Sequence, residues 1–175
     1  MHKRRHKTLQ NKSKPLYDLS FQSVPMQSLE ESLNYCPDTG VFTWKLTSRN
    51  GGRVIKGRVA GSVGQNGYRT IVFMGVRFLA HRLAWFMYYR TAPRNHIDHI
   101  DRNRLNNKIE NLRDVSRSVN MLNTDAKGYE VDSNTNKVYA RLMVEGKRRH
   151  IGTFNCTTAA HVAYLIEKQK ELTKW

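Results

Sequence analysis

The sequence predicts an α+β chain made of three successive parts. A β-rich N-terminal region leads into a compact unit of two strands and a helix, and a small three-stranded antiparallel sheet with one helix ends the chain. Three observations predict this order. Glycines divide residues 29–80 into short strand-like runs, polar residues gather between Asp98 and Asn120, and the pattern after Gly128 is typical of three strands and a helix.

The first part, residues 1–25, is predicted to be a basic, disordered arm. Up to Lys14 it holds six Lys or Arg, two His and no acidic residue, with Leu9 as its only large apolar residue after Met1. A segment of this composition cannot bury a core. Nonspecific contact with phosphates and a purely solubilising role both stay open.

Residues 26–123 are predicted to form one domain that begins with short strands. Residues 68–73 and 76–80 flank Met74-Gly75, so we expect a hairpin with two residues at its tip. Residues 81–90 then predict a helix, whose aromatic side chains should pack in the core.

Residues 128–175 are predicted to form a second domain with a βββα pattern. Strands are expected at 128–132, 138–144 and 148–154, and a helix from about Thr158, with Thr157 or Thr158 as its N-cap. Apolar residues of this helix recur at i, i+3, i+4 and i+7, so this stripe should pack on the sheet: Ala159, Val162, Ala163 and Ile166.

The charge of the chain points to a polyanionic partner. Thirty Lys and Arg against fourteen Asp and Glu give a net charge of +16. Residues 39–97 contain ten Lys or Arg and no acid, whereas an ordinary solvated surface mixes both signs. Such an excess favours nucleic acid or an acidic membrane surface.

Several classes of protein are not expected. The chain has no apolar run of about 18 residues, so no membrane span is predicted. Cys36 and Cys156 lie far apart without ligand-like neighbours, which favours reduced thiols over a disulfide or zinc site. With a charged N-terminus that lacks an apolar signal core, the expected location is the cytoplasm.

The polar residues between Asp98 and Asn120 predict metal-assisted cleavage of phosphodiesters. Mg²⁺ takes few protein oxygens, and Asp98 and Asn120 could supply two. His99 could take a proton from water aimed at phosphorus. Asn111 belongs to the same catalytic set as a support that holds backbone groups. We therefore expect one divalent metal, Mg²⁺ or Mn²⁺.

Local patterns favour this arrangement. Residues 97–100 and 111–115 are strand candidates separated by turn residues. Ser116 could cap a short helix that would place Asn120 one turn in, facing Asp98.

Other roles for these residues stay open. His96 and His99 could form half of a zinc site, although no second ligand pair is near. Asp98, His99 and Asn111 could also stabilise a turn without chemistry. Nearby polar residues are assigned to structure: Asp101 and Asn103 to a turn, Asn106 and Asn107 to loop backbone, and His81 and His150 to packing or phosphate contact.

This stretch contains, in order, His96-Ile97-Asp98-His99-Ile100-Asp101, Asn103, Leu105-Asn106-Asn107, Ile109-Glu110-Asn111-Leu112-Arg113 and Asn120. With these residues it resembles the HNH endonucleases, in particular homing-type proteins of phages and introns. The resemblance covers roughly residues 40–123 and implies a ββα-metal core in which His99 is the general base and Asp98 and Asn120 bind the metal. It places the central asparagine of the motif at Asn111.

The tail from Gly128 contains Tyr139-Ala140-Arg141-Leu142, Gly146-Lys147-Arg148, Ile151-Gly152-Thr153-Phe154 and Ala159-Ala160. With these residues it resembles an AP2-type DNA-binding domain, whose sheet enters the major groove. Basic side chains expected to contact DNA lie in both domains: Arg82, Arg102, Arg113, Arg141, Lys147, Arg148 and Arg149.

Together these patterns predict an endonuclease that cuts double-stranded DNA at an extended site. A DNA-binding regulator with an inactive core is the alternative, and an RNA-binding protein is a more distant one because no RNA-module signature is present. The resemblance implies a monomer that nicks one strand, while a dimer that cuts both strands stays open. If the protein is phage-encoded, it would act in the host cytoplasm.

Overall fold

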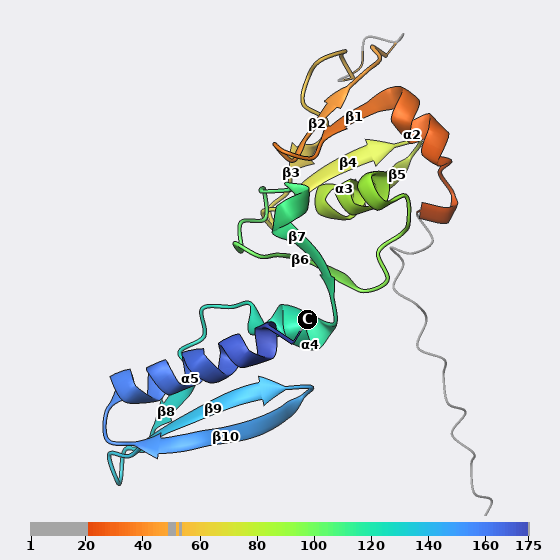
Figure 1. The fold of residues 1–175 in the computed structure, drawn as a ribbon. Coiled ribbons are helices and arrows are strands. Elements are labelled where there is room, and N and C mark those ends of the chain that lie inside the picture. Colours follow the sequence, from red (N-terminus) through yellow and green to blue (C-terminus); the bar gives the residue numbers. More distant parts are fainter. Residues whose placement is uncertain (1–20, 49–51, 53, 175) are drawn as a thin grey trace, which may run out of the picture.

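The computed structural model describes residues 21–48, 52 and 54–174, so most of the predicted arm lies outside the described residues. Figure 1 shows two lobes, an N-terminal lobe (residues 21–115) and a C-terminal lobe (residues 124–174), with one short helix between them. The N-terminal lobe contains, in chain order, α2 (Met26–Ser32), β1 (Leu33–Cys36), β2 (Val41–Trp44), β3 (Ser62–Val63), β4 (Arg69–Phe73), β5 (Val76–Leu79), α3 (Ala80–Tyr89), β6 (His96–His99), η1 (Ile109–Asn111) and β7 (Leu112–Val115).

The N-terminal lobe has three small antiparallel sheets around one core. β1 pairs with β2, β4 lies between β3 and β5, and β6 pairs with β7. α3 contacts β4, β5 and β6, and Leu83 of α3 is fully buried with Phe42 and Ile71 from two of the sheets. Phe21 and Val24 also belong to this core, so the last residues of the predicted arm are part of the folded lobe.

The predicted hairpin and helix of this lobe are present. β4 and β5 are joined by Met74 and Gly75, whose φ values of 50° and 77° are the left-handed pair that a two-residue hairpin turn needs. α3 follows directly, and Arg90 ends it in a left-handed conformation with φ 55°.

The C-terminal lobe is the predicted three-stranded antiparallel sheet with one helix. Its elements are β8 (Tyr129–Val131), β9 (Val138–Val144), β10 (Lys147–Phe154) and α5 (Thr157–Leu172), with β9 central. Cys156 caps α5 by accepting a hydrogen bond from the Ala159 amide, so neither predicted threonine is the cap. The helix begins one residue before Thr158, and this places both threonines inside its first turn.

The face of α5 that packs on the sheet differs from the predicted stripe. Ala160 and Tyr164 are buried against β9, whereas Val162 and Ile166 are about half exposed. Gly128 explains the difference, because a Cβ there would lie 2.0 Å from Cγ of Tyr164. The missing side chain lets the tyrosine ring rest on the backbone and sets the rotation of the helix.

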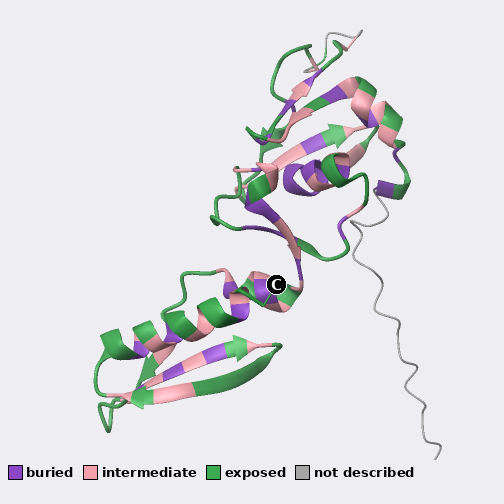
Figure 2. Cartoon of the chain, viewed as in Figure 1, coloured by how far each residue is buried: buried purple, intermediate pink, exposed green. Residues whose placement is uncertain are grey.

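The helix α4 (Arg117–Leu122) joins the lobes and shares the core of the second one (Figure 2). Leu122 is buried with Leu142 and Tyr164. The Ser118 hydroxyl accepts a hydrogen bond of 2.7 Å from the Glu145 amide at the tip of the β9–β10 hairpin. The C-terminal lobe therefore supports the helix that completes the central polar unit.

Other expectations about the whole chain can be compared with the described residues. None of the described helices has the length and apolar character that crossing a bilayer requires. Cys36 and Cys156 are both free thiols, as the sequence predicts.

Candidate functional site

The central polar residues lie on two paired strands and the helix that follows them. β6 and β7 are antiparallel, with Asp98 opposite Arg113 and His99 opposite Leu112. Ser116 caps α4 as predicted, since its hydroxyl accepts a hydrogen bond from the Val119 amide. Sequence and structure agree on these three elements because each has a strong local signal.

Asn111 holds the loop between the two strands. Its Nδ2 donates to Oδ1 of Asp101 at 2.9 Å and to the carbonyl of Asn106 at 2.8 Å, and its Oδ1 accepts from the Asp101 amide. Burial raises the pKa of Asp101, but hydrogen bonds from Asn106, Asn103 and Asn111 outweigh it, so the pKa lies below its usual value. These contacts fit the support role predicted for Asn111.

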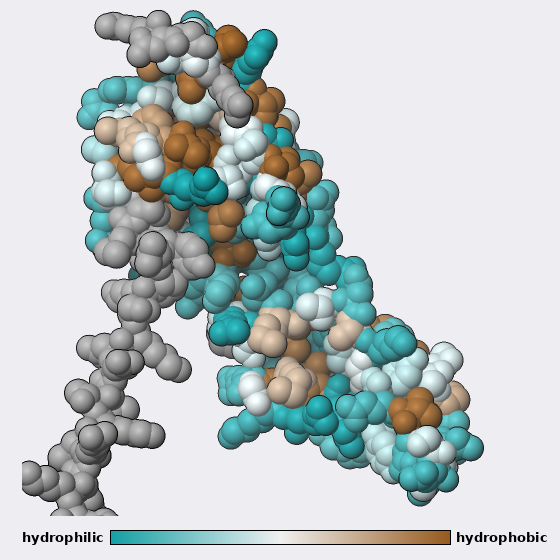
Figure 3. Space-filling model, turned by 180° about the vertical axis from the view of Figure 1, so that it is seen from behind, coloured by the Kyte–Doolittle hydropathy of each residue, from teal (hydrophilic) through white to brown (hydrophobic). Residues whose placement is uncertain are grey.

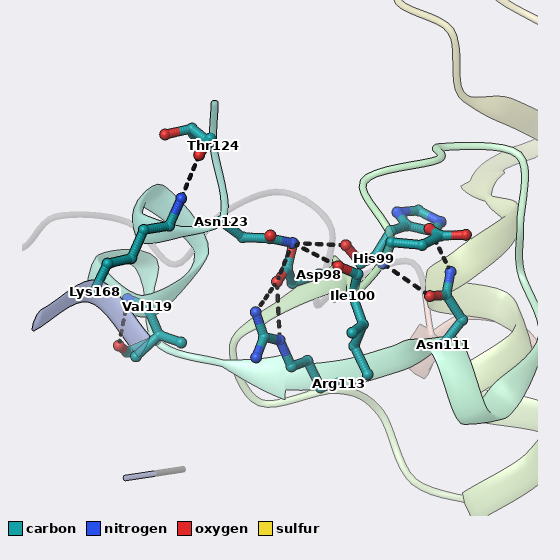
Figure 4. Close-up of polar contacts among 11 residues, drawn as sticks. Asp98, His99, Ile100, Asn111, Arg113, Val119, Asn123, Thr124 and Lys168 are labelled. Carbon is teal, nitrogen blue, oxygen red and sulfur yellow. Dashed lines mark hydrogen bonds and ion pairs between the residues drawn. The ribbon is translucent and has the colours of Figure 1, made fainter. Parts of the chain in front are cut away.

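Asp98 is buried and held by two side chains (Figure 4). Nε and Nη2 of Arg113 donate to its Oδ2 at 2.9 and 2.7 Å. Nδ2 of Asn123 lies 3.2 Å from Oδ1 and 3.1 Å from Oδ2, and it also donates to the carbonyl of His99 at 2.7 Å. The carboxylate is therefore neutralised on one oxygen, and from the described residues its other oxygen accepts one long hydrogen bond.

His99 is also buried, with 4 % of its surface exposed. Its Nε2 lies 3.0 Å from Oδ1 of Asn107. The ring of His81 packs edge-on at 5.0 Å and that of Tyr68 lies 6.0 Å away, both measured between ring centroids. The imidazole is thus enclosed on several sides.

Asn120 meets Asp98 and His99 at one cleft. It lies in α4, and together these three residues contribute to the lining of an open cleft of about 310 Å³. Tyr68 and Arg104 line the same cleft, with the guanidinium carbon of Arg104 4.9 Å from the centre of the Tyr68 ring. The structure therefore brings the predicted base and both predicted metal ligands together.

The oxygens at this cleft suit a hard divalent cation. The described residues contain no group of three His, Cys, Asp or Glu that could hold a metal, so a site here would depend on one carboxylate and one amide. Mg²⁺ is commonly bound in this way, because it retains waters and takes further oxygens from a substrate phosphate. A zinc site would need more nitrogen or sulfur ligands, and His96 is exposed while His99 is buried.

His81 has a structural role. Burial is the largest of the effects that lower its pKa to about 3, and the neighbouring His99 and Arg82 contribute the rest. The ring is therefore neutral at physiological pH and packs between Tyr68 and His99.

Three predicted DNA contacts lie in or near the central unit, and they differ in placement. Arg82 is buried, and its guanidinium donates to the carbonyls of Asn95 and Pro93, so we leave it out of the proposed interface. Arg113 forms an ion pair with Asp98. Arg102 pairs with the exposed Asp125 and lines the cleft that holds His99.

The other four predicted contacts lie on β9 and β10. Arg141 is on the sheet face away from α5, because its neighbours Ala140 and Leu142 are buried against the helix. Arg148 lies on the same face, and both arginines pair with Glu130. The side of the C-terminal lobe that Figure 3 shows is mostly hydrophilic, with scattered apolar residues.

Arg149 and Lys147 lie differently. Arg149 reaches α5, where Nη1 donates to Glu171 at 2.8 Å and Nη2 to Glu167 at 3.2 Å. Lys147 is exposed at the start of β10. Arg141 and Arg148 therefore lie on the outer face of the sheet. Lys147 lies at the hairpin, and Arg149 binds the helix.

Two residues of the site were missed from the sequence. Asn123 follows Asn120 by three positions, about one helical turn, and this spacing is a signal that it could reach Asp98. Asn107 was assigned to loop backbone, but its side chain contacts His99. No local pattern distinguishes it from its neighbour Asn106.

Comparison with known proteins matches only the central part of the chain. Residues 78–122 match the family model of the HNH endonucleases, a range that starts in β5 and ends with the last residue of α4. Comparisons with curated proteins and with solved structures find no match. The matched range contains Asp98, His99, Asn111 and Asn120 and excludes the C-terminal lobe. Residues 78–122 of this chain are therefore an HNH endonuclease domain.

Proposed function

We propose that this protein is a metal-dependent endonuclease that hydrolyses phosphodiester bonds of double-stranded DNA. The observation that carries the proposal is that Asp98, His99 and Asn120, all within the matched range, line one cleft. A base and two oxygen ligands at one surface are what hydrolysis of a phosphodiester with one divalent metal requires.

His99 is the proposed general base. A neutral imidazole accepts protons near physiological pH and can take one from a water molecule aimed at the scissile phosphorus. Its enclosure by Asn107, His81 and Tyr68 supports this role, because a base must be held in one orientation to act on one water.

Asp98 and Asn120 are the proposed ligands of Mg²⁺ or Mn²⁺. Arg113 holds Oδ2 of Asp98, so Oδ1 is the oxygen more available to a cation, and the amide oxygen of Asn120 can supply a second ligand. When bound, the metal polarises the phosphoryl oxygen and stabilises the leaving 3′ oxygen. Arg113 and Asn123 orient the carboxylate, the usual role of groups that bind a ligand but not the metal.

The charge and the C-terminal lobe support DNA as the substrate. A net charge of +16 favours a polyanion. The outer face of the β9–β10 hairpin presents Arg141 and Arg148, beside Tyr139, whose ring centre lies 5.6 Å from the Arg141 guanidinium carbon. We propose that this AP2-like sheet reads an extended site next to the cut, as in a homing-type nuclease that works as a monomer.

Cleavage mapping on a phage genomic library tests this function. Purified protein with Mg²⁺ or Mn²⁺ should cut at a small number of sites, and EDTA should abolish cleavage. The ends would report the site and whether one or both strands are cut. DNA binding without cleavage under every metal condition would favour the regulator with an inactive core.

A further inference from the structure

The side chain of Asn107 makes the closest polar contact of the His99 ring. Asn107 is almost fully buried, and its Oδ1 lies 3.0 Å from Nε2 of His99. A buried pair of this kind has no water to replace a lost partner, so the two groups must complement each other as donor and acceptor.

The surroundings of Asn107 decide which of its amide atoms faces the ring. Its Nδ2 lies 3.4 Å from the carbonyl of Leu105, to which it donates. The reversed amide would point its oxygen at that carbonyl, so two acceptors would face each other. Oδ1 therefore faces His99, and an acceptor there requires a proton on Nε2.

The backbone of Asn107 is held by the β1–β2 hairpin, which lies outside the HNH match. The Tyr35 hydroxyl donates to the carbonyl of Asn107 at 2.8 Å, and burial raises the pKa of this hydroxyl, so it stays a donor. Gly40 packs against the same peptide, where a Cβ would lie 2.4 Å from the carbonyl carbon of Asn107. The asparagine is thus fixed in place before any substrate binds.

We propose that Asn107 is a positioning residue that holds His99 in the tautomer with its proton on Nε2 and leaves Nδ1 to accept the proton of the attacking water. This inference rests on the proposed function for its catalytic consequence. The tautomer itself is a property of the free protein.

Nitrogen-15 NMR of the histidine rings in the full metal-free chain tests the proposal. At a pH where the imidazoles are neutral, His99 should show a protonated Nε2 and an unprotonated Nδ1. The variant Asn107→Leu removes the acceptor and should yield a mixture of tautomers. Asn106→Leu is the matched control, since its side chain binds Asp101 and not the ring.

Single-turnover cleavage by the same variants should show whether Asn107 affects the cleavage step or the binding of DNA. Asn107→Leu should lower the cleavage rate by at least about tenfold, a part of what a general base contributes, with DNA affinity unchanged. A proton on Nδ1 of His99 in the wild-type protein would overturn the proposal, even if no variant folds. The proposal would also be overturned if Asn107→Leu showed the same tautomer of His99 as the wild type. Failure of the proposed function would look different, as DNA binding by the wild type without cleavage under any metal condition, with the tautomer of His99 unchanged.

Discussion

At the scale of single residues, the site combines one charged pair with several neutral contacts. Asp98 has 8 % of its side chain exposed and Arg113 24 %, so their ion pair lies in a largely dry environment. A buried pair of this kind is costly to break from one side, because the remaining charge has lost its partner. Asp98 is therefore expected to serve both stability and metal binding.

The substitution Asp98→Asn should reveal both roles. It removes the charge that Arg113 binds, so the free energy of unfolding should fall by about 1–3 kcal/mol in denaturant titration. Binding of Mn²⁺, followed by calorimetry, should weaken at least about tenfold, because a neutral amide replaces the only carboxylate of the proposed site. Asp125→Asn is the control, since this carboxylate is 85 % exposed and its pair with Arg102 should matter little. Equal effects of the two substitutions would argue against a special role for Asp98.

His81 should make the stability of the protein depend on pH. Its pKa is lowered to about 3 from an ordinary value of 6.5, so the unfolded chain takes up this proton more readily than the folded one. The stabilisation is complete above about pH 6.5 and should be lost as the pH falls towards about 3, by up to a few kcal/mol. Denaturant titrations across this range should show a weaker dependence for His81→Leu. The exposed His96→Leu should keep the wild-type dependence, and a His81→Leu protein that also kept it would contradict the assignment.

At the scale of elements, the sequence predicts what depends on local chemistry. The β6–β7 pair, the Ser116 cap and the Met74-Gly75 turn were predictable, since each follows from residues close in the chain. The packed face of α5 was not, because Val162 and Ile166 form an equally good apolar stripe. Gly128, which lies more than thirty residues before Val162, determines which face of α5 packs on the sheet.

Gly128 should therefore be sensitive to substitution. In Gly128→Ala the new Cβ would overlap the Tyr164 ring, and the φ of 71° adds backbone strain. We expect a loss of at least about 3 kcal/mol in the free energy of unfolding, a cost typical of overpacking together with a strained backbone. Gly146→Ala is the matched control, because its φ is 75° but no atom lies within 4 Å of the added Cβ. It should cost only about 1–2 kcal/mol, and similar losses for both would mean that the tyrosine contact is unimportant.

The site itself was predictable in part for the same reason. Local patterns indicate the strand that carries Asp98 and His99 and the capped helix that carries Asn120, and the structure brings the three residues together. The burial of Arg82 and the binding of Arg149 to α5 follow from how separate elements pack, which neither the basic charge nor the AP2-type resemblance reveals. Asn123 was missed because its contact with Asp98 depends on where α4 ends.

At the scale of the whole molecule, the two lobes are joined by side-chain contacts as well as by the covalent chain. Leu122 packs into the core of the C-terminal lobe, and Lys168 of α5 donates to the carbonyl of Thr124 (Figure 4). Residues 124–127 are thus attached to α5, where His161 also bonds to the carbonyl of Lys127. A DNA duplex bound to the outer sheet face would be held in a defined relation to the cleft.

The salt dependence of DNA binding should identify that face. Each lost phosphate contact lowers the slope of log affinity against log salt by about 0.9, so Arg141→Ala combined with Arg148→Ala should lower it by up to about two. Arg149→Ala should leave the slope unchanged and lower stability, since its guanidinium binds Glu167 and Glu171. An unchanged slope in the double variant would remove the outer face from the interface.

The central claim is that His99 is the base of a DNA-cleaving site, and single-turnover cleavage at saturating protein tests it most directly. The substrate is a plasmid carrying a mapped site, and the metal is Mg²⁺. His99→Ala should cut at least about a hundredfold more slowly than the wild type while binding DNA with similar affinity. His96→Ala, on the same strand but exposed, should cut at the wild-type rate. Cleavage by His99→Ala at the wild-type rate would contradict the account.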